Sequence, residues 1–246
     1  MNIGVIGTGQ IGEVIIRKLR GAGYRVKMAN ARDPESLKDL AAKTGAIPVS
    51  VEEVVQDVDI LFLVLPQKAF PVLPKGLLNK AKKETIVIDV GNYYSWRDGR
   101  IDEIESGLTD SAWVEKQIGR PVVKVLNSIG SKSLAGAGRL HGSRDRVALP
   151  ISGDNPKAKE IVAQLLDRIG FDSVDAGTIA ESWRQQPGSP IYCVNPTKEE
   201  LQQRLKNVDR SSLVTNREKS SEAFYAVVDA DYQTQVRAHR SALVKE

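Results

Sequence analysis

Three glycines near the N-terminus constrain the fold of this chain more than any other feature. Gly7, Gly9 and Gly12 have the spacing G-x-G-x-x-G, after the apolar run 3–6 and before a helical pattern over 13–20. A strand, a glycine turn and a helix in this order are typical of the loop that binds the pyrophosphate of a dinucleotide. A glycine turn that binds no ligand is the alternative.

Each glycine of this loop has a separate physical role in such a site. Gly7 permits the tight turn, Gly9 lets the backbone approach the pyrophosphate, and Gly12 lets helix and strand pack closely. The N-terminus of the following helix offers free N–H groups and the positive end of the helix dipole. We therefore expect the cofactor to contact the whole loop, which comprises Gly7, Thr8, Gly9, Gln10, Ile11 and Gly12.

Short apolar runs alternate with helical segments as far as Asp175. Several runs are almost continuously apolar, as in strands that helices cover on both faces of a parallel sheet. Helix starts are marked by Asp33 with Pro34 and by Ser50 with Glu53. The alternation predicts an α/β fold, a doubly wound parallel sheet of the Rossmann type. We expect strands at residues 3–6, 25–29, 60–65, 85–90, 122–126, 147–151 and 172–175, and a helix over 156–169.

The chain changes character after Asn195, where it becomes polar and helical in pattern. Its 246 residues are 41% hydrophobic and 27% charged, an ordinary globular composition that excludes a disordered or collagen-like chain. We expect an NAD(P)-binding domain over residues 1–194 and a helical C-terminal tail over residues 195–246.

The tail is predicted to present one apolar helix face. A capping box, Thr197 with Glu200, starts its first helix. Apolar side chains then recur every four residues, at Phe224, Val228, Tyr232 and Val236. Such a face packs either back on the core domain or against a second subunit, so a homodimer through the C-terminal helices is one of two expectations.

Several classes of protein are disfavoured by composition. One cysteine, Cys193, and two histidines, His141 and His239, offer no zinc spacing, so we expect no metal. The net charge is +4, but basic and acidic residues are interleaved, so we expect no nucleic-acid partner. The longest apolar run, 60–66, is far shorter than the roughly 20 residues of a membrane helix. With no export signal at the N-terminus, we expect a cytoplasmic protein without a membrane partner.

The residues after the second strand favour NADP(H) over NAD(H). Sites that prefer NAD place a carboxylate there, on the ribose hydroxyls. This chain has Asn30 and Arg32, an amide and a guanidinium that suit a 2′-phosphate. NAD(H) binding is the alternative, in which Arg32 is a solvated loop residue and Asp33 takes the ribose instead of capping the next helix.

Ligands of open α/β sheets bind beyond the carboxyl ends of the strands. That rule points to Leu65 and Pro66, to Asn92, and to Asn127. We expect the first three to contact the cofactor near its nicotinamide and Asn127 to contact the substrate. Ordinary turn chemistry explains these residues equally well.

Two segments, 93–100 and 181–193, hold a large share of the few aromatic residues. Aromatic rings beside arginines suit a flat, anionic partner, although they could equally cap the core. The expected substrate pocket therefore comprises Tyr93, Tyr94, Asn127, Trp183, Arg184 and Tyr192. No acid and base stand in a recognisable catalytic spacing, so the catalytic residues are left unassigned.

These residues together resemble the NADP oxidoreductases typified by the coenzyme F420 (deazaflavin) dependent NADP reductase. The nucleotide domain is also similar to pyrroline-carboxylate reductase and to STEAP metalloreductase domains. The resemblance rests on residues 3–12, 30–35, 65–66 and 89–94, and it covers the chain to about Asp175. It implies that the glycine loop holds the pyrophosphate, that Asn30 and Arg32 hold the 2′-phosphate, and that a deazaflavin could be the co-substrate.

The resulting hypothesis is an oxidoreductase that passes a hydride between nicotinamide and a second acceptor, either deazaflavin-like or another small molecule. A reductase of a small carbonyl or imine is one alternative, and it would need a proton donor such as Tyr93, Tyr94 or Tyr192. A non-catalytic NADP-sensing module that binds a partner through its tail is the other.

Overall fold

Contacts within the chain divide the computed structural model into two units, Met1–Lys124 and Val125–Glu246. The structure describes residues 1–243, without the side chains of Ser220, Phe224 and Tyr225. Each unit is described by itself. The predicted boundary between residues 194 and 195 is a different division of the chain and stays a prediction.

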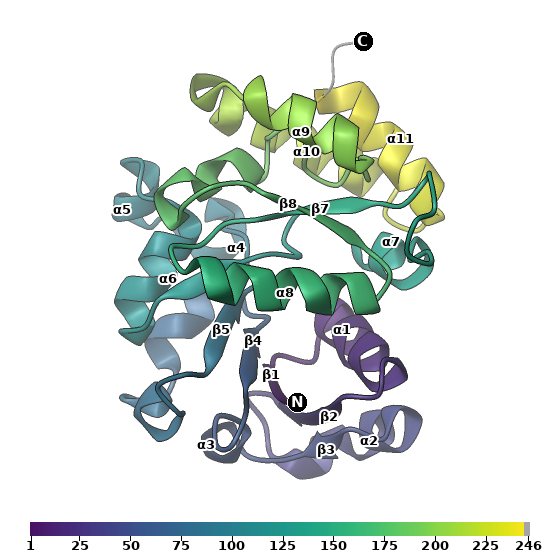
Figure 1. Ribbon diagram of the computed structural model, residues 1–246. Helices are drawn as coiled ribbons and strands as arrows, with labels where there is room; N and C mark the ends of the chain where they lie inside the picture. Colours follow the sequence, from purple (N-terminus) through teal and green to yellow (C-terminus); the bar gives the residue numbers. More distant parts are fainter. Residues whose placement is uncertain (244–246) are drawn as a thin grey trace. The chain divides into compact units, whose positions relative to one another are not determined.

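The first unit contains a parallel sheet whose strand order is β3-β2-β1-β4-β5-β6 (Figure 1). This is the strand order of doubly wound dinucleotide-binding sheets, with the order reversing between β1 and β4. The predicted Rossmann-type fold is therefore confirmed. The strands are β1 (Asn2–Ile6), β2 (Arg25–Ala29), β3 (Ile47–Pro48), β4 (Ile60–Leu63), β5 (Ile86–Asp89) and β6 (Val122–Lys124).

Two connections of this unit begin where the sequence predicts. Asp33 caps the first turn of η1 by accepting the Ser36 N–H at 3.0 Å, and Ser50 and Glu53 form the expected capping box. Between β4 and β5 the chain makes two short 3-10 helices, η2 and η3, and Pro71 lies within the first. The helices are α1 (Gln10–Gly21), η1 (Pro34–Leu37), α2 (Lys38–Thr44), α3 (Val51–Val54), η2 (Gln67–Val72), η3 (Leu77–Lys80), α4 (Ser95–Asp98), α5 (Asp102–Glu105) and α6 (Asp110–Ile118).

The second unit corrects one prediction about the sheet. Strands β7 (Ala148–Ile151) and β8 (Asp172–Asp175) form where expected, but they pair with each other in a separate parallel sheet instead of extending the larger one. An apolar run identifies a strand but does not say which strand it pairs with. Directly after β6, Leu126 has a φ of +64°, so the chain turns sharply there. Helices α7 (Ser131–Gly136) and α8 (Pro156–Arg168) and the 3-10 helix η4 (Ile179–Gln185) complete this region.

The C-terminal part corrects a second prediction, that of one helix with a continuous apolar face. The capping box of Thr197 and Glu200 is confirmed. However, the chain leaves helical geometry after Ala226, and Asp231 caps a new helix by accepting the Thr234 N–H at 3.0 Å. The four-residue spacing of the apolar side chains gave no indication of this second N-cap. The elements are α9 (Lys198–Lys206), η5 (Arg210–Ser212), α10 (Leu213–Ala226) and α11 (Tyr232–Leu243).

The apolar positions of the expected face consequently lie on different elements. Val228 is 40% exposed in the turn between the helices, and Tyr232 and Val236 belong to α11. The side chain of Phe224 lies outside the described residues. The buried face of α11 consists of Gln235, His239 and Leu243.

We predict that His239 makes the stability of the protein fall in mild acid. Its imidazole is 2% exposed, and burial lowers its pKa from 6.5 to about 4. Over this pH range His239 binds a proton in the unfolded chain but stays neutral in the folded chain. The free energy of unfolding therefore decreases as the pH falls from about 6.5 to about 4. The loss should be roughly 3 kcal/mol. Thermal unfolding at pH 7 and pH 4.5 should show a smaller fall for His239→Asn than for the wild type, and equal falls would contradict the prediction.

Candidate functional site

Two glycines of the glycine loop are required by backbone packing. Gly7 has a φ of +103°, and a Cβ there would lie 2.1 Å from the carbonyl oxygen of Val64. A Cβ at Gly12 would lie 2.0 Å from the carbonyl oxygen of Gly7. These contacts hold the start of α1 close to the ends of β1 and β4, so both glycines are needed whether or not a ligand binds.

Gly9 differs, because the fold does not require a glycine at this position. Its φ is −71°, and no heavy atom lies within 4 Å of a Cβ built on it. It is exposed, and it is the N-cap residue of α1, where it supplies no capping side chain. The space that a side chain would fill is therefore open, as it must be where a pyrophosphate lies on the backbone at a helix N-terminus. Thr8, Gln10 and Ile11 are partly or fully exposed around it, so the residues present fit a dinucleotide.

The loop after β2 places Arg32 in solvent. The side-chain oxygen of Asn30 accepts the Arg32 N–H at 2.8 Å, and its amide nitrogen donates to Ser36 Oγ at 3.3 Å. Asp33 is occupied as the helix cap, as expected. Because β2 pairs with β1, this loop and the glycine loop leave neighbouring strands, and such strands lie about 4.8 Å apart in a sheet.

Leu65, Pro66 and Asn92 follow the two strands on the other side of β1. A Cβ at Gly91 would lie 2.8 Å from the carbonyl oxygen of Leu65, so the chain segments that leave β4 and β5 touch. Asn92 is half-buried. The structure therefore brings the predicted cofactor residues of four segments to one edge of one sheet.

A buried ion pair at this edge was missed by sequence reasoning. Asp89 and Lys124 are register partners at the ends of β5 and β6, both side chains are 0% exposed, and their charged atoms are 3.2 Å apart. Ser111 Oγ donates to Asp89 at 2.6 Å. Opposite charges that end two apolar strands were the available signal, but using it required knowing that the strands are neighbours.

The aromatic residues of the first unit have different environments. Tyr93 is fully buried, and its hydroxyl donates to Glu105 at 2.8 Å and accepts the Ile101 N–H at 3.2 Å. The ring of Tyr94 is half-buried, with Trp96 at 5.6 Å and the guanidinium of Arg97 at 5.2 Å. Tyr94 therefore offers a ring face near solvent, whereas Tyr93 holds the segment in place.

The other predicted pocket residues belong to the second unit. Asn127 is 3% exposed and exchanges two hydrogen bonds with Gln185, at 2.7 and 2.9 Å. Trp183 has two guanidinium groups over its ring, from Arg184 at 5.4 Å and Arg210 at 5.5 Å. The ring of Tyr192 lies 6.0 Å from that of His239. The predicted meeting of these residues with those of the first unit in one pocket stays a prediction.

Cys193 is chemically quiet. Burial raises the pKa of its thiol to about 12, so the thiol is protonated at physiological pH. A protonated thiol is a poor nucleophile. Cys193 is therefore unsuited to covalent catalysis.

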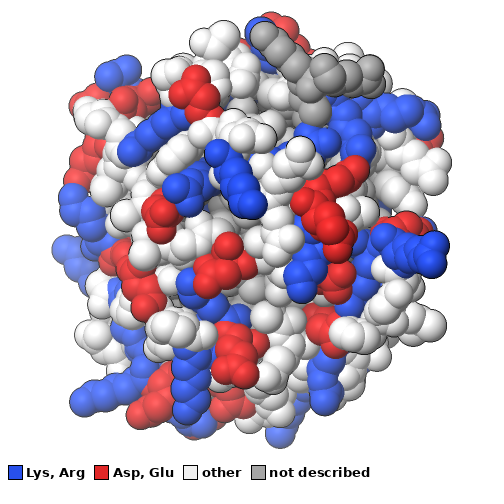
Figure 2. All heavy atoms as spheres, turned by 45° about the horizontal axis from the view of Figure 1, so that its top comes forward, with Lys and Arg blue, Asp and Glu red and all other residues white. Residues whose placement is uncertain are grey.

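Features of three other kinds of function can be sought in the described residues. Within residues 1–243, no three His, Cys, Asp or Glu side chains gather as metal ligands would. No helix among them has the length and apolarity needed to cross a membrane. On the face shown in Figure 2, basic and acidic side chains are intermixed.

Known proteins share parts of the sequence. Residues 2–93 match the model of a family described as NADP oxidoreductase coenzyme F420-dependent. The Escherichia coli protein YjhV is 52% identical over 52 residues, which are 21% of this chain. The match covers 38% of the length of that curated relative.

Solved structures share the fold. The hypothetical protein SMa0349 of Sinorhizobium meliloti has a TM-score of 0.69 at 25% identity, over 80% of this chain and 96% of its own. A candidate F420-dependent NADP reductase from an Arthrobacter species has a TM-score of 0.59 at 23% identity, over 73% of this chain and 86% of its own. A pyrroline-5-carboxylate reductase of Streptococcus pyogenes has a TM-score of 0.51 at 13% identity, over 99% and 77%.

The last two likenesses concern the fold alone, so the family model carries the assignment. Through residues 2–93, this chain is similar to the coenzyme F420-dependent family of NADP oxidoreductases, which confirms the predicted resemblance.

Proposed function

We propose that this protein is an NAD(P)-dependent oxidoreductase that moves a hydride between a nicotinamide dinucleotide and a second, small molecule. The observation that carries the proposal is the open space at Gly9, at the N-terminus of α1. Gly7 and Gly12 are explained by packing, whereas no contact within the protein requires a glycine at position 9, and a ligand that approaches the bare backbone would require one. The family match of residues 2–93 supports the same reading.

The proposed cofactor lies along the edge formed by the strand ends. The glycine loop, residues 7–12, holds the pyrophosphate. Asn30 orders the loop after β2, and Arg32 binds the 2′-phosphate, which makes NADP(H) the preferred cofactor and NAD(H) a weaker one. Leu65, Pro66 and Asn92 hold the nicotinamide end.

Hydride transfer requires mainly that the nicotinamide and the acceptor are correctly positioned. A bound nicotinamide supplies or takes up the hydride, and this step needs two aligned rings and a site that excludes water. The chain supplies a fixed backbone at the strand ends and the half-buried ring of Tyr94. We assign no catalytic acid or base.

The proposed acceptor is flat and anionic, with a deazaflavin as the first candidate. In the first unit, Tyr94 with Arg97 combines an aromatic face with positive charge. A carbonyl or imine substrate would need a proton donor, and the buried hydroxyl of Tyr93 already donates to Glu105. A cytoplasmic location and a homodimer through the C-terminal helices belong to the proposal as well.

The first test is titration calorimetry of the full chain with NADPH and NADH, followed by addition of a deazaflavin while nicotinamide absorbance is recorded. We expect selective binding of NADPH and its oxidation by the deazaflavin. Binding without oxidation would indicate another acceptor, or a sensor without turnover. Absence of binding would overturn the proposal.

Substitution of the glycines should separate packing from binding. Gly9→Ala should leave the melting temperature unchanged, because the new methyl group meets no protein atom, and should weaken NADPH binding by about tenfold or more because it occupies the phosphate space. Gly12→Ala should lower the melting temperature, because its Cβ would meet the carbonyl of Gly7. Unchanged NADPH affinity in Gly9→Ala would contradict the assigned role.

Arg32→Ala should discriminate between the two cofactors. Loss of a charge-assisted contact of roughly 1.5 to 3 kcal/mol should weaken NADPH at least about tenfold and leave NADH almost unchanged. Arg25→Ala is the matched control, because Arg25 is exposed at the opposite end of β2. Equal losses for NADPH and NADH would refute the role of Arg32.

A further inference from the structure

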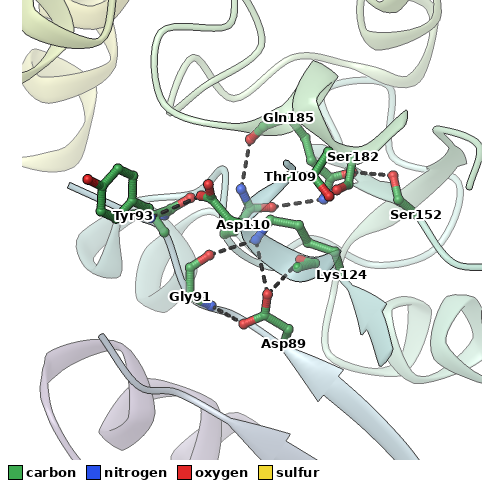
Figure 3. Close-up of polar contacts among 12 residues, drawn as sticks. Asp89, Gly91, Tyr93, Thr109, Asp110, Lys124, Ser152, Ser182 and Gln185 are labelled. Carbon is green, nitrogen blue, oxygen red and sulfur yellow. Dashed lines mark hydrogen bonds and ion pairs between the residues drawn. The ribbon is translucent and has the colours of Figure 1, made fainter. Parts of the chain in front are cut away.

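The backbone that leaves β5 is held by charged side chains. The Gly91 N–H donates to Asp89 Oδ1 at 2.9 Å, and the Gly91 carbonyl accepts from Lys124 Nζ at 2.8 Å (Figure 3). The buried pair at the strand ends therefore binds both polar groups of one loop residue. Asp89 and Lys124 also bind each other, so the three residues are linked in a ring.

The same pattern continues along the next three residues. The Asn92 carbonyl accepts from the guanidinium of Arg97. The N–H of Tyr93 donates to Asp110 at 3.0 Å, and that of Tyr94 donates to Asp98 at 3.1 Å. The loop 91–94 is thus bonded from β5, β6, α4 and α6.

Stability of the fold does not explain this choice of residues. Burying an ion pair such as Asp89 with Lys124 costs desolvation energy, and apolar residues of similar size would hold two strands at least as well. Charge-assisted bonds are shorter, stronger and more directional than neutral ones, so they fix the path of a backbone. Fixing a loop at a strand end is useful where that loop must present a group to a ligand.

The position of the loop 91–94 in the sheet indicates which part of the cofactor it would contact. Strands β1 and β4 separate β5 from β2 in the sheet. The loop that follows β2 carries Arg32. A dinucleotide with its pyrophosphate at β1 and its adenosine end at β2 therefore extends toward β4 and β5 with its nicotinamide half. Asn92 is half-buried there, with its backbone carbonyl bound to Arg97.

We propose that Asp89, Lys124 and Arg97 are positioning residues, which hold Asn92 against the nicotinamide half of the cofactor. This inference rests on the proposed cofactor. It adds that affinity for the nicotinamide half depends on side chains behind the loop, which themselves do not touch the cofactor.

The test compares two ligands, NADPH and adenosine 2′,5′-bisphosphate, which lacks the nicotinamide half. The main variant is Arg97→Met, because Arg97 is 31% exposed and its loss should not prevent folding. We expect NADPH to weaken roughly tenfold and the bisphosphate to change less than about twofold, in titration calorimetry. Arg100→Met is the matched control, because Arg100 pairs with the exposed Asp102 and should leave both affinities unchanged.

A second variant pair addresses the buried ion pair. Lys124→Met leaves Asp89 buried without its cation, whereas Asp89→Asn with Lys124→Met removes both charges, so the double variant should regain melting temperature but not NADPH affinity. Regained NADPH affinity in the double variant, or equal weakening of both ligands by Arg97→Met, would overturn the positioning role. If the wild type bound neither ligand, the proposed cofactor itself would be refuted.

Discussion

The close approach of the first helix to the first and fourth strands is the constraint on which the proposed nucleotide site depends. At Gly7 and Gly12 a Cβ would come within 2.1 Å and 2.0 Å of a carbonyl oxygen, so larger residues would push the helix away. With the helix held there, its N-terminus lies at the ends of β1 and β4, and the glycine loop before it is bonded to the end of β2. The space at Gly9 is left open by this packing, and it is the part of the loop that a ligand can use.

A second principle is the use of charge at the ends of apolar strands. Strand β5 is buried along Val87 to Asp89, and strand β6 is buried throughout, yet each ends in an ionised side chain. Since the two end residues are register partners, the sheet places each charge beside its counter-charge. The sheet thereby supplies both the apolar layer that supports the fold and the polar groups that order the adjoining loop.

Local signals in the sequence were enough to predict the glycine loop, the strands of the larger sheet except β3, and the caps at Asp33, Ser50 and Thr197, because each depends on residues close in sequence. Pairing was not predictable in the same way. Strands β7 and β8 form a separate sheet, and Asp231 starts a new helix where the four-residue spacing suggested a continuous face. The Asp89 and Lys124 pair was not predicted, because the two residues are 35 positions apart in the sequence and only the strand register brings their side chains together.

The buried thiol has a practical consequence. Cys193 is the one cysteine of the 246 residues, and its pKa of about 12 keeps it protonated. Thiol reagents react with the thiolate. They should therefore modify this chain only when local unfolding exposes the segment around Cys193 to water. The rate at which a thiol reagent modifies the unsubstituted chain would therefore measure how often the segment around Cys193 opens.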